Sequence, residues 1–314
     1  MQIRNELAKN SKTWCGLNKP DMKSEEADAV VFGIPFDGGA SYRGGAAEAP
    51  EMLRANSFHS TPCTEKLEYY SDFTVFDAGD FPLTMENREE VFKEIQDFVA
   101  DLVRKGKKFT MVGGDHSVTI PVERGIDDAL DEEFGIIHID AHMDLCDALE
   151  GDFLSHGNTE KRALELKNIN GYENLYFIGI RSIEPDEFEQ YMKYPVQVKT
   201  AYDCYKEGIE AVADDCIAKM SKYKKVYITY DIDSLDPAYA AGTGTPQFGG
   251  LTSRMALTLF EKLFTNLNVI GFDIVEIAPA LDPSLSAMFA GRKLITEGWG
   301  YWAKELGKLV GRNL

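Results

Sequence analysis

The chain has 314 residues, and its 33 basic and 52 acidic side chains give a net charge of −19. This excess of acid disfavours nucleic acids and anionic membranes as partners, and no apolar run approaches the roughly 18 to 20 residues of a membrane span. Five scattered cysteines without a CxxC pair argue against a disulfide framework or a zinc knuckle. With an N-terminus that lacks the apolar core of a signal peptide, these features predict a cytoplasmic protein.

Residues 1–27 are polar and irregular, and we expect an N-terminal arm that Trp14 holds in part against the domain. Residues 28–314 contain no linker rich in Ser, Gly or Pro, which predicts a single domain. Short apolar runs predict strands, and apolar residues at helical spacing predict helices. The expected strands are 28–36, 74–78, one near 111, 134–139, 175–180, 196–198, 225–230 and 269–275, and the expected helices are 49–57, 86–104, 117–129, 159–168, 184–192, 207–221, 252–264 and one from 284 onward.

This alternation of strands and helices predicts an α/β fold. Right-handed crossovers would build a central, mostly parallel sheet with helices on both faces. In such sheets, ligands bind beyond the carboxyl ends of the strands. Functional side chains are therefore expected in the segments that directly follow strands.

The first such segment follows the apolar run 134–139. Asp140, His142 and Asp144 alternate there, and an extended backbone would place all three side chains on the same side. Two carboxylates and an imidazole crowded at the end of a buried strand would repel one another and lose hydration. A cation between them would remove both costs, so the segment predicts a metal site.

Two further strand ends repeat the pattern. Asp231 and Asp233 follow the run 225–230, and Asp115 and His116 follow a short apolar run and two glycines. Together the three segments offer too many ligands for one ion. Sites rich in oxygen with a single imidazole per ion suit Mn²⁺, unlike zinc in a thiolate site or copper. Two such ions roughly 3.5 to 4 Å apart can lower the pKa of a shared water, which predicts a hydrolase.

Several spaced motifs resemble those of the ureohydrolases, the superfamily of arginase and agmatinase. They are GIPFDGG at 33–39, GGDHS at 113–117, DAHMDL at 140–145, SHGN at 155–158, DIDSLDPAYA at 231–240, GTGTPQFGGLTSR at 242–254 and DIVEIAP at 273–279. The resemblance runs from about residue 28 to the C-terminus. It implies a three-layer α/β/α sandwich, two Mn²⁺ ions per subunit, hydrolysis of a guanidino group to urea and an amine, and a homo-oligomer, either trimer or hexamer.

The resemblance also implies a ligand for each position around the two ions. One ion would be bound by His116 and Asp144, and the other by His142 and Asp233. The bridging carboxylates would be those of Asp140 and Asp231.

Four residues are implied in binding and converting the substrate. Glu276 stands where the family has a carboxylate that grips the guanidinium group, a charge-assisted contact that can be bidentate. His156 stands at the position of a proton-shuttling histidine, and Asp144 is the expected proton donor to the departing amine. Thr245, in the glycine-rich loop 242–250, is expected to line the pocket, and Thr243 in the same loop is a further candidate.

The departures from the motifs concern the tail of the substrate. Cys146 replaces an asparagine with which arginases recognise arginine, which disfavours arginine as the substrate. Gln247 and Asn158 stand where agmatinases usually have an acidic residue and a threonine. Agmatine, a dication, is preferred, and formiminoglutamate is disfavoured. The alternatives 4-guanidinobutyrate and 3-guanidinopropionate would need a cation in the pocket, for which Arg43 and Arg181 are the candidates.

Two other classes of function remain open. A non-catalytic relative could keep the fold, although every expected metal position is filled. A two-metal hydrolase of another amide or amidine would share the site, and only a substrate panel would distinguish it. Among single residues, Asp115 is expected to fix its turn rather than bind metal, and His138 to pack within its strand rather than contact the site.

Overall fold

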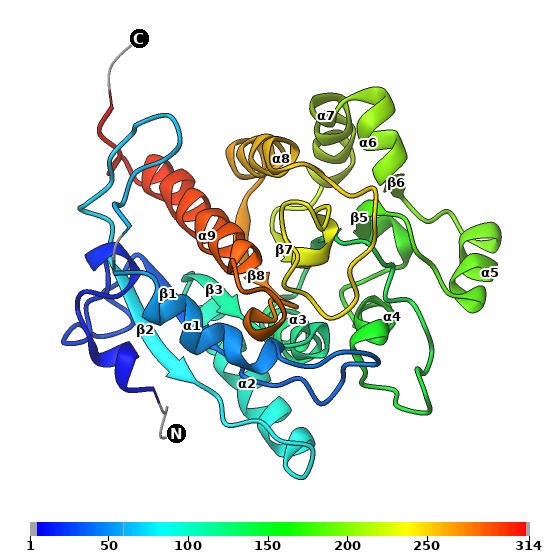
Figure 1. Ribbon diagram of the computed structural model, residues 1–314, viewed down its shortest axis with the longest axis horizontal. Helices are drawn as coiled ribbons and strands as arrows, with labels where there is room; N and C mark the ends of the chain where they lie inside the picture. Colours follow the sequence, from blue (N-terminus) through cyan, green and yellow to red (C-terminus); the bar gives the residue numbers. More distant parts are fainter. Residues whose placement is uncertain (1–4, 59, 312–314) are drawn as a thin grey trace.

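The computed structural model describes residues 5–58 and 60–311. Its centre is an eight-stranded sheet with the order β2-β1-β3-β8-β7-β4-β5-β6, in which each pair of neighbours is parallel (Figure 1). The strands are β1 (Ala29–Gly33), β2 (Val75–Asp80), β3 (Lys108–Val112), β4 (Gly135–Ile139), β5 (Leu175–Ile180), β6 (Val198–Thr200), β7 (Val226–Tyr230) and β8 (Val269–Ile274). The predicted parallel sheet is confirmed.

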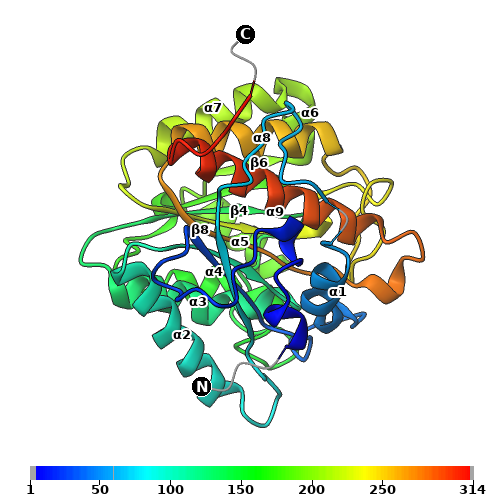
Figure 2. The same ribbon diagram turned by 90° about the vertical axis from the view of Figure 1, so that its left-hand side faces the viewer.

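Helices cover both faces of this sheet, as Figure 2 shows. One hydrophobic cluster joins the sheet to α1, α6, α7, α8 and α9, and a second joins its other face to α2, α3 and α4. The helices are α1 (Ala49–Ala55), α2 (Arg88–Arg104), α3 (Thr119–Ala129), α4 (Thr159–Ala163), α5 (Pro185–Lys193), α6 (Ala201–Glu207), α7 (Ile209–Met220), α8 (Ser253–Asn266) and α9 (Ser286–Glu305). The three-layer α/β/α sandwich is therefore confirmed.

The strand order explains how distant segments meet. β3 and β4 follow each other in the sequence, yet β8 and β7 lie between them in the sheet. Because all four strands are parallel, their carboxyl ends share one edge. The segments after β3, β4, β7 and β8 are the ones that carry the predicted metal and substrate residues.

Two helices differ locally from the expectation. The helix expected over 207–221 is present as α7, from Ile209 to Met220, but the preceding α6 was not expected, and Gly208, with φ +87°, separates the two. The start of α6 is fixed by a capping box, in which the Thr200 hydroxyl accepts from the backbone of Asp203 and the Asp203 side chain accepts in return. The helix expected over 159–168 ends at Ala163.

The N-terminal arm packs on the sheet from residue 5 onward. Trp14 is buried, and its indole nitrogen donates a hydrogen bond of 2.5 Å to Asp77 in β2. The expected anchoring by Trp14 is confirmed, while residues 1–4 of the predicted arm lie outside the described residues. Among the residues described, no helix has the length and hydropathy that crossing a bilayer requires.

Candidate metal centre and active site

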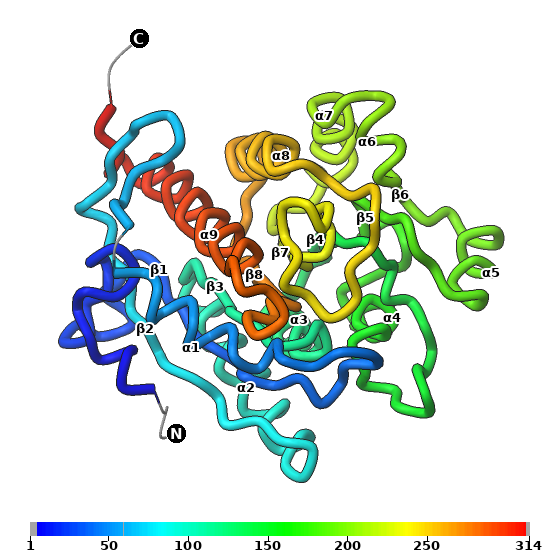
Figure 3. Tube along the Cα trace, in the orientation of Figure 1, coloured from blue at the N-terminus to red at the C-terminus, as the bar shows by residue number. Residues whose placement is uncertain are grey.

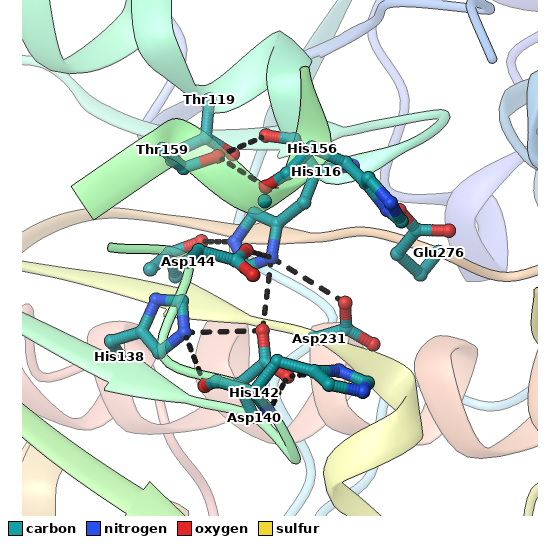
Figure 4. Close-up of polar contacts among 12 residues, drawn as sticks. His116, Thr119, His138, Asp140, His142, Asp144, His156, Thr159, Asp231 and Glu276 are labelled. Carbon is teal, nitrogen blue, oxygen red and sulfur yellow. Dashed lines mark hydrogen bonds and ion pairs between the residues drawn. The ribbon is translucent and has the colours of Figure 1, made fainter. Parts of the chain in front are cut away.

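The first group of predicted ligands surrounds His116, which follows β3. Its Nδ1 lies 3.0 Å from Asp144 Oδ2, 3.1 Å from Asp140 Oδ2 and 3.4 Å from Asp231 Oδ2 (Figure 4). These aspartates come from the segments after β4 and β7. One imidazole nitrogen and three carboxylate oxygens therefore converge on one point. The four residues that supply these atoms are the ones that the motifs predict as ligands of one ion.

The second group surrounds His142. Its Nδ1 lies 3.2 Å from Asp233 Oδ2 and 3.4 Å from Asp140 Oδ1. The two oxygens of Asp140 thus face different histidines, one in each group. This is the placement expected of a carboxylate that bridges two ions.

The backbone reaches this arrangement differently from the expected extended chain. After β4 the chain turns, and the Asp140 carboxylate accepts a hydrogen bond of 2.7 Å from the backbone N–H of His142. Asp144 has φ +53°, in the left-handed region that non-glycine residues rarely adopt. The three residues do meet, but a sharp turn brings Asp144 to His116, and the prediction of a common side on an extended strand is wrong.

The hydrogen bonds of His116 prepare it for a metal ion. Its Nε2 lies 2.7 Å from Thr229 Oγ1, and the Thr229 hydroxyl donates in turn to Asp273 Oδ1 at 2.9 Å. Because that hydroxyl hydrogen is already used, Thr229 must accept from Nε2, which fixes the ring proton there. Nδ1 then presents a free lone pair to the carboxylates, as a metal-binding imidazole requires.

The residues present fit a pair of divalent cations. His116 Nδ1 and Asp140 Oδ2 are buried and form no hydrogen bond within the described chain. Burial, followed by the charges of Asp233 and Asp140, holds the pKa of Asp231 well above its ordinary range. Bound cations would satisfy these atoms and relieve the repulsion between the carboxylates. Oxygen ligands with one imidazole per group suit a hard divalent cation.

His138 contacts this centre, contrary to expectation. The ring is buried within β4, as predicted, but its Nε2 lies 3.1 Å from Asp140 Oδ2 and 3.2 Å from the His142 carbonyl. Nδ1 lies 3.0 Å from Glu160 Oε1. The signal was available in the sequence, because residues two apart on a strand share one face and His138 precedes Asp140 by two.

A second pair of predicted site residues lies beside the predicted metal ligands. Glu276, which follows β8, is almost completely buried and has φ +62°. Its Oε1 accepts from the backbone N–H of His116 at 2.9 Å and lies 3.0 Å from His156 Nδ1. The strained backbone of Glu276 is thus held by its neighbours, a pattern common at functional sites. The structure brings the expected shuttle histidine and guanidinium carboxylate together.

An open cavity of about 190 Å³ is lined by His156 together with Asp144 and Asp231, whereas Glu276, which contacts His156, is not among the described residues of its wall. Thr245 lines it and donates to Asp233 Oδ2 at 3.1 Å, whereas Thr243 is fully buried away from the cavity. Asp115 accepts hydrogen bonds from Gly39 and from Ser117. Its observed contacts hold two loops together, as expected of a residue that fixes its turn.

Several residues that line the cavity lie outside the predicted set, among them Ser41, Glu184 and Glu187. Ser41 lies in the connection between β1 and α1, and its hydroxyl oxygen is 2.8 Å from His156 Nε2. Glu184 and Glu187 lie at the start of α5, directly beyond the carboxyl end of β5. A signal for the two glutamates existed, because Glu184, Pro185 and Glu187 form the pattern of a helix N-terminus with a capping box.

Comparisons with known proteins agree with this geometry. A model of the arginase family matches residues 27–298. The agmatinase of Bacillus subtilis is 36% identical over 275 residues, 87% of this chain and 91% of that protein. The guanidinobutyrase of Pseudomonas aeruginosa is 31% identical over 274 residues, 86% of this chain and 85% of that protein. The structure of proclavaminate amidino hydrolase from Streptomyces clavuligerus has a TM-score of 0.83 at 30% identity and covers 93% of this chain and 97% of its own.

Proposed function

This chain belongs to the arginase family, and from this premise we propose that it is a binuclear manganese enzyme that hydrolyses agmatine to putrescine and urea. The observation that carries the proposal is the convergence of two groups of His and Asp side chains beside the pair formed by Glu276 and His156. The proposed ligands are His116 and Asp144 for one ion, His142 and Asp233 for the other, and Asp140 and Asp231 between them. When bound, the two ions would lower the pKa of a shared water.

The protein residues would orient the substrate and move its protons. The Glu276 carboxylate is buried and next to the proposed ligands, so it can hold a guanidinium group through charge-assisted hydrogen bonds. Burial disfavours charge on His156, but its hydrogen bond to Glu276 and the charge of that carboxylate raise the pKa of His156 to about 9. We propose that Asp144 protonates the departing amine and that His156 exchanges protons with solvent.

The preference for a cationic tail rests on how the two candidate arginines are used. Arg43 donates to the carbonyls of Gly244 at 3.0 Å and Thr243 at 2.9 Å. The Arg181 guanidinium likewise donates hydrogen bonds to backbone carbonyls, including those of Asp233 at 2.7 Å and Gln247 at 2.8 Å. Among the described residues that line the cavity, none is Lys or Arg. A guanidino acid would find no free cation for its carboxylate.

Glu184 offers the opposite charge at the cavity. It lines the wall and is exposed, so its carboxylate can meet an ammonium group at the far end of the substrate. Glu187 also lines the cavity, but its two oxygens accept from the backbone of Leu145 and of Glu184, each at 2.8 Å. Glu187 therefore fixes the wall, and Glu184 is the better partner for an ammonium tail.

One observation keeps a guanidino acid as the second candidate. Gln247 lines the cavity, and its amide nitrogen lies 3.5 Å from His142 Nε2. The amide gives this part of the wall no negative charge, which lowers the penalty for an anionic substrate. The similarity to a guanidinobutyrase is consistent with this alternative.

A substrate panel tests the proposal. Urea release from Mn²⁺-loaded protein would be measured with agmatine, arginine, 4-guanidinobutyrate and 3-guanidinopropionate. Agmatine is expected to be turned over selectively, and Glu184→Gln to raise its KM about tenfold, which corresponds to about 1.4 kcal/mol of lost attraction. Glu189→Gln is the matched control, because Glu189 lies on the same helix, is exposed and is absent from the cavity wall. Selective turnover of a guanidino acid would replace the proposed substrate, and no urea from any compound would refute the proposed hydrolysis.

We also propose that the chain forms a homo-oligomer, a trimer or a hexamer. Large apolar side chains stand exposed on α5, where Phe188 is 51% and Met192 is 69% exposed. Phe248, in the loop before α8, is 91% exposed. Exposed apolar groups of this kind support association between copies of the chain.

A further inference from the structure

The glycine-rich connection between β1 and α1 reaches across the sheet edge to His156. Figure 3 shows it as a blue tube that extends from the region of β1 towards the green segment around α4. In the sequence, His156 comes shortly before α4. At its tip, Ser41 Oγ lies 2.8 Å from His156 Nε2, and the Ser41 backbone nitrogen lies 3.1 Å from the same atom. The opposite ring nitrogen, Nδ1, faces Glu276 at 3.0 Å. Serine, histidine and glutamate thus form a continuous chain of polar contacts.

The connection is anchored on both sides of Ser41. On one side, the Gly39 N–H donates to Asp115 Oδ2 at 2.7 Å, and the Gly39 carbonyl accepts from the backbone N–H of His156 at 3.2 Å. On the other side, the Arg43 guanidinium is bound by the carbonyls of the loop after β7. The position of Ser41 therefore depends on its neighbours, and loss of its hydroxyl is not expected to release the segment.

The contacts of His156 define where its proton lies. A backbone N–H can only donate, so Nε2 must accept from Ser41. The ring proton then lies on Nδ1 and is donated to Glu276 Oε1. The acidic surroundings of His156 favour a second proton on the ring, and this proton would have to occupy Nε2. The protonated Nε2 could then no longer accept a hydrogen bond from the Ser41 N–H. The Ser41 hydroxyl can turn to accept a hydrogen bond from the protonated Nε2, because a hydroxyl is both donor and acceptor.

Ser41 is more exposed than the ring that it contacts. The His156 side chain is only 12% exposed, whereas Ser41 is exposed, and both line the cavity. The hydroxyl therefore contacts the ring nitrogen at one end and can contact bulk water at the other. Proton exchange through it needs rotation of one C–O bond and no movement of the backbone.

We propose that Ser41 relays protons between His156 and solvent during turnover, an inference that rests on the proposed hydrolysis. In that reaction, one water forms the new C–O bond of urea and the C–N bond to the alkyl amine breaks. The departing nitrogen gains two protons and leaves as an ammonium group, so the guanidinium charge is conserved. One proton of the water reaches this nitrogen through Asp144, and the other is released to solvent. His156 supplies the second proton of the ammonium group and takes one back from solvent through Ser41, which passes its own hydrogen to Nε2 while it accepts another from water.

The test compares kcat at very low buffer concentration, where no dissolved acid can replace the relay. Ser41→Ala is expected to lower kcat about tenfold, with little change in KM; this is less than the roughly 10²- to 10⁴-fold effect of a group that transfers the proton directly. Adding imidazole or phosphate as a proton carrier should restore kcat in proportion to carrier concentration, while wild type stays unchanged. Ser41→Thr keeps a hydroxyl and should retain most of the wild-type kcat without a carrier.

Tyr42→Phe is the matched control, since it removes a hydroxyl from the same segment. Tyr42 is 75% exposed, and its hydroxyl forms no hydrogen bond to any described residue. It should behave as wild type at every buffer concentration. A Ser41→Ala enzyme with wild-type kcat at low buffer would overturn the relay, as would a loss of kcat that no carrier restores. Absence of urea from the wild-type protein would instead refute the hydrolase itself and the relay with it.

Discussion

Two buried groups of aspartates differ in what balances their charge. The first, which we call the Arg54 cluster, consists of Arg54 in α1 with Asp77 and Asp80 in β2. Arg54 is fully buried, and its three nitrogens donate to these carboxylates at 2.5 to 2.9 Å. Burial opposes the charged form of Arg54, but Asp77 and Asp80 raise its pKa further above its ordinary value. The chain supplies its own cation, so this cluster is complete.

The second group, which we call the metal-ligand cluster after its proposed role, consists of His116, Asp140, His142, Asp144, Asp231 and Asp233. Within the part of the chain that the structure describes, no Arg or Lys side chain forms an ion pair with these aspartates. Buried atoms without hydrogen bonds remain, and Asp144 has a strained backbone. Burial of acids therefore does not by itself mark a functional site. Buried acids that no Arg or Lys side chain of the described chain balances are the better indicator.

The largest expected effect tests the metal-ligand cluster. Asp231→Asn should lower urea release at least about 10⁴-fold, equivalent to about 5 kcal/mol, because it removes a proposed bridging ligand. In the metal-free protein the same change should leave the free energy of unfolding unchanged or raise it, because it relieves repulsion with Asp140 and Asp233. Metal content by mass spectrometry and urea denaturation with a chelator would measure the two effects. Activity near the wild-type level, or a strongly destabilised metal-free protein, would contradict this account.

The same substitution in the Arg54 cluster should act in the opposite way. Asp77 accepts hydrogen bonds from Trp14 and Gly79 as well as from Arg54. Asp77→Asn leaves the buried guanidinium of Arg54 with only one of its two carboxylate partners. Such a loss typically lowers the free energy of unfolding by about 3 to 5 kcal/mol. Urea denaturation should show this loss, while kcat per folded molecule and metal content remain at wild-type levels. If Asp77→Asn were neutral for stability, the cluster would not depend on its internal ion pair.

Most of the fold could be predicted from the sequence because each strand is a short buried run followed by turn residues. The same logic led to the proposed metal ligands, since each of them lies within a few residues of the end of such a run. Local backbone detail was out of reach. The left-handed turn at Asp144 is held by contacts with distant segments, including the backbone bond from Lys161 N–H to the Asp144 carbonyl. Propensity along the chain carries no information about such contacts.

Residues that act through a neighbour were hardest to recognise. Ser41 reaches His156 across 115 positions, and only the folded sheet edge brings them together. Asp77 and Asp80 also follow the expected pattern of acids near a strand end, yet nothing in their sequence distinguishes them from metal ligands. The distinction needs the position of Arg54, which comes from a different element. Sequence therefore locates acids at strand ends, while the structure decides which of them already have a cation.

Glu187 differs from both clusters, because it is buried but has neither an internal cation nor a proposed metal ion beside it. Burial prevails over the hydrogen bonds from the backbone of Glu184 and Leu145 and raises the pKa of Glu187 from 4.5 to about 7. The folded state then binds more protons than the unfolded state between these values, so Glu187 lowers the free energy of unfolding as pH rises through this window. Glu187→Gln should remove that dependence.

The difference in unfolding free energy between Glu187→Gln and wild type should therefore rise by about 2 kcal/mol from pH 5 to pH 8, measured by urea denaturation with a chelator present. Superimposed on it is a loss of about 1 kcal/mol at every pH, because Gln has one acceptor oxygen for two backbone N–H donors. Glu189→Gln, on the exposed side of α5, should show neither effect. A difference that is constant with pH would mean that the two backbone donors alone compensate the charge of Glu187, and that a buried acid of this protein can be stable without any cation.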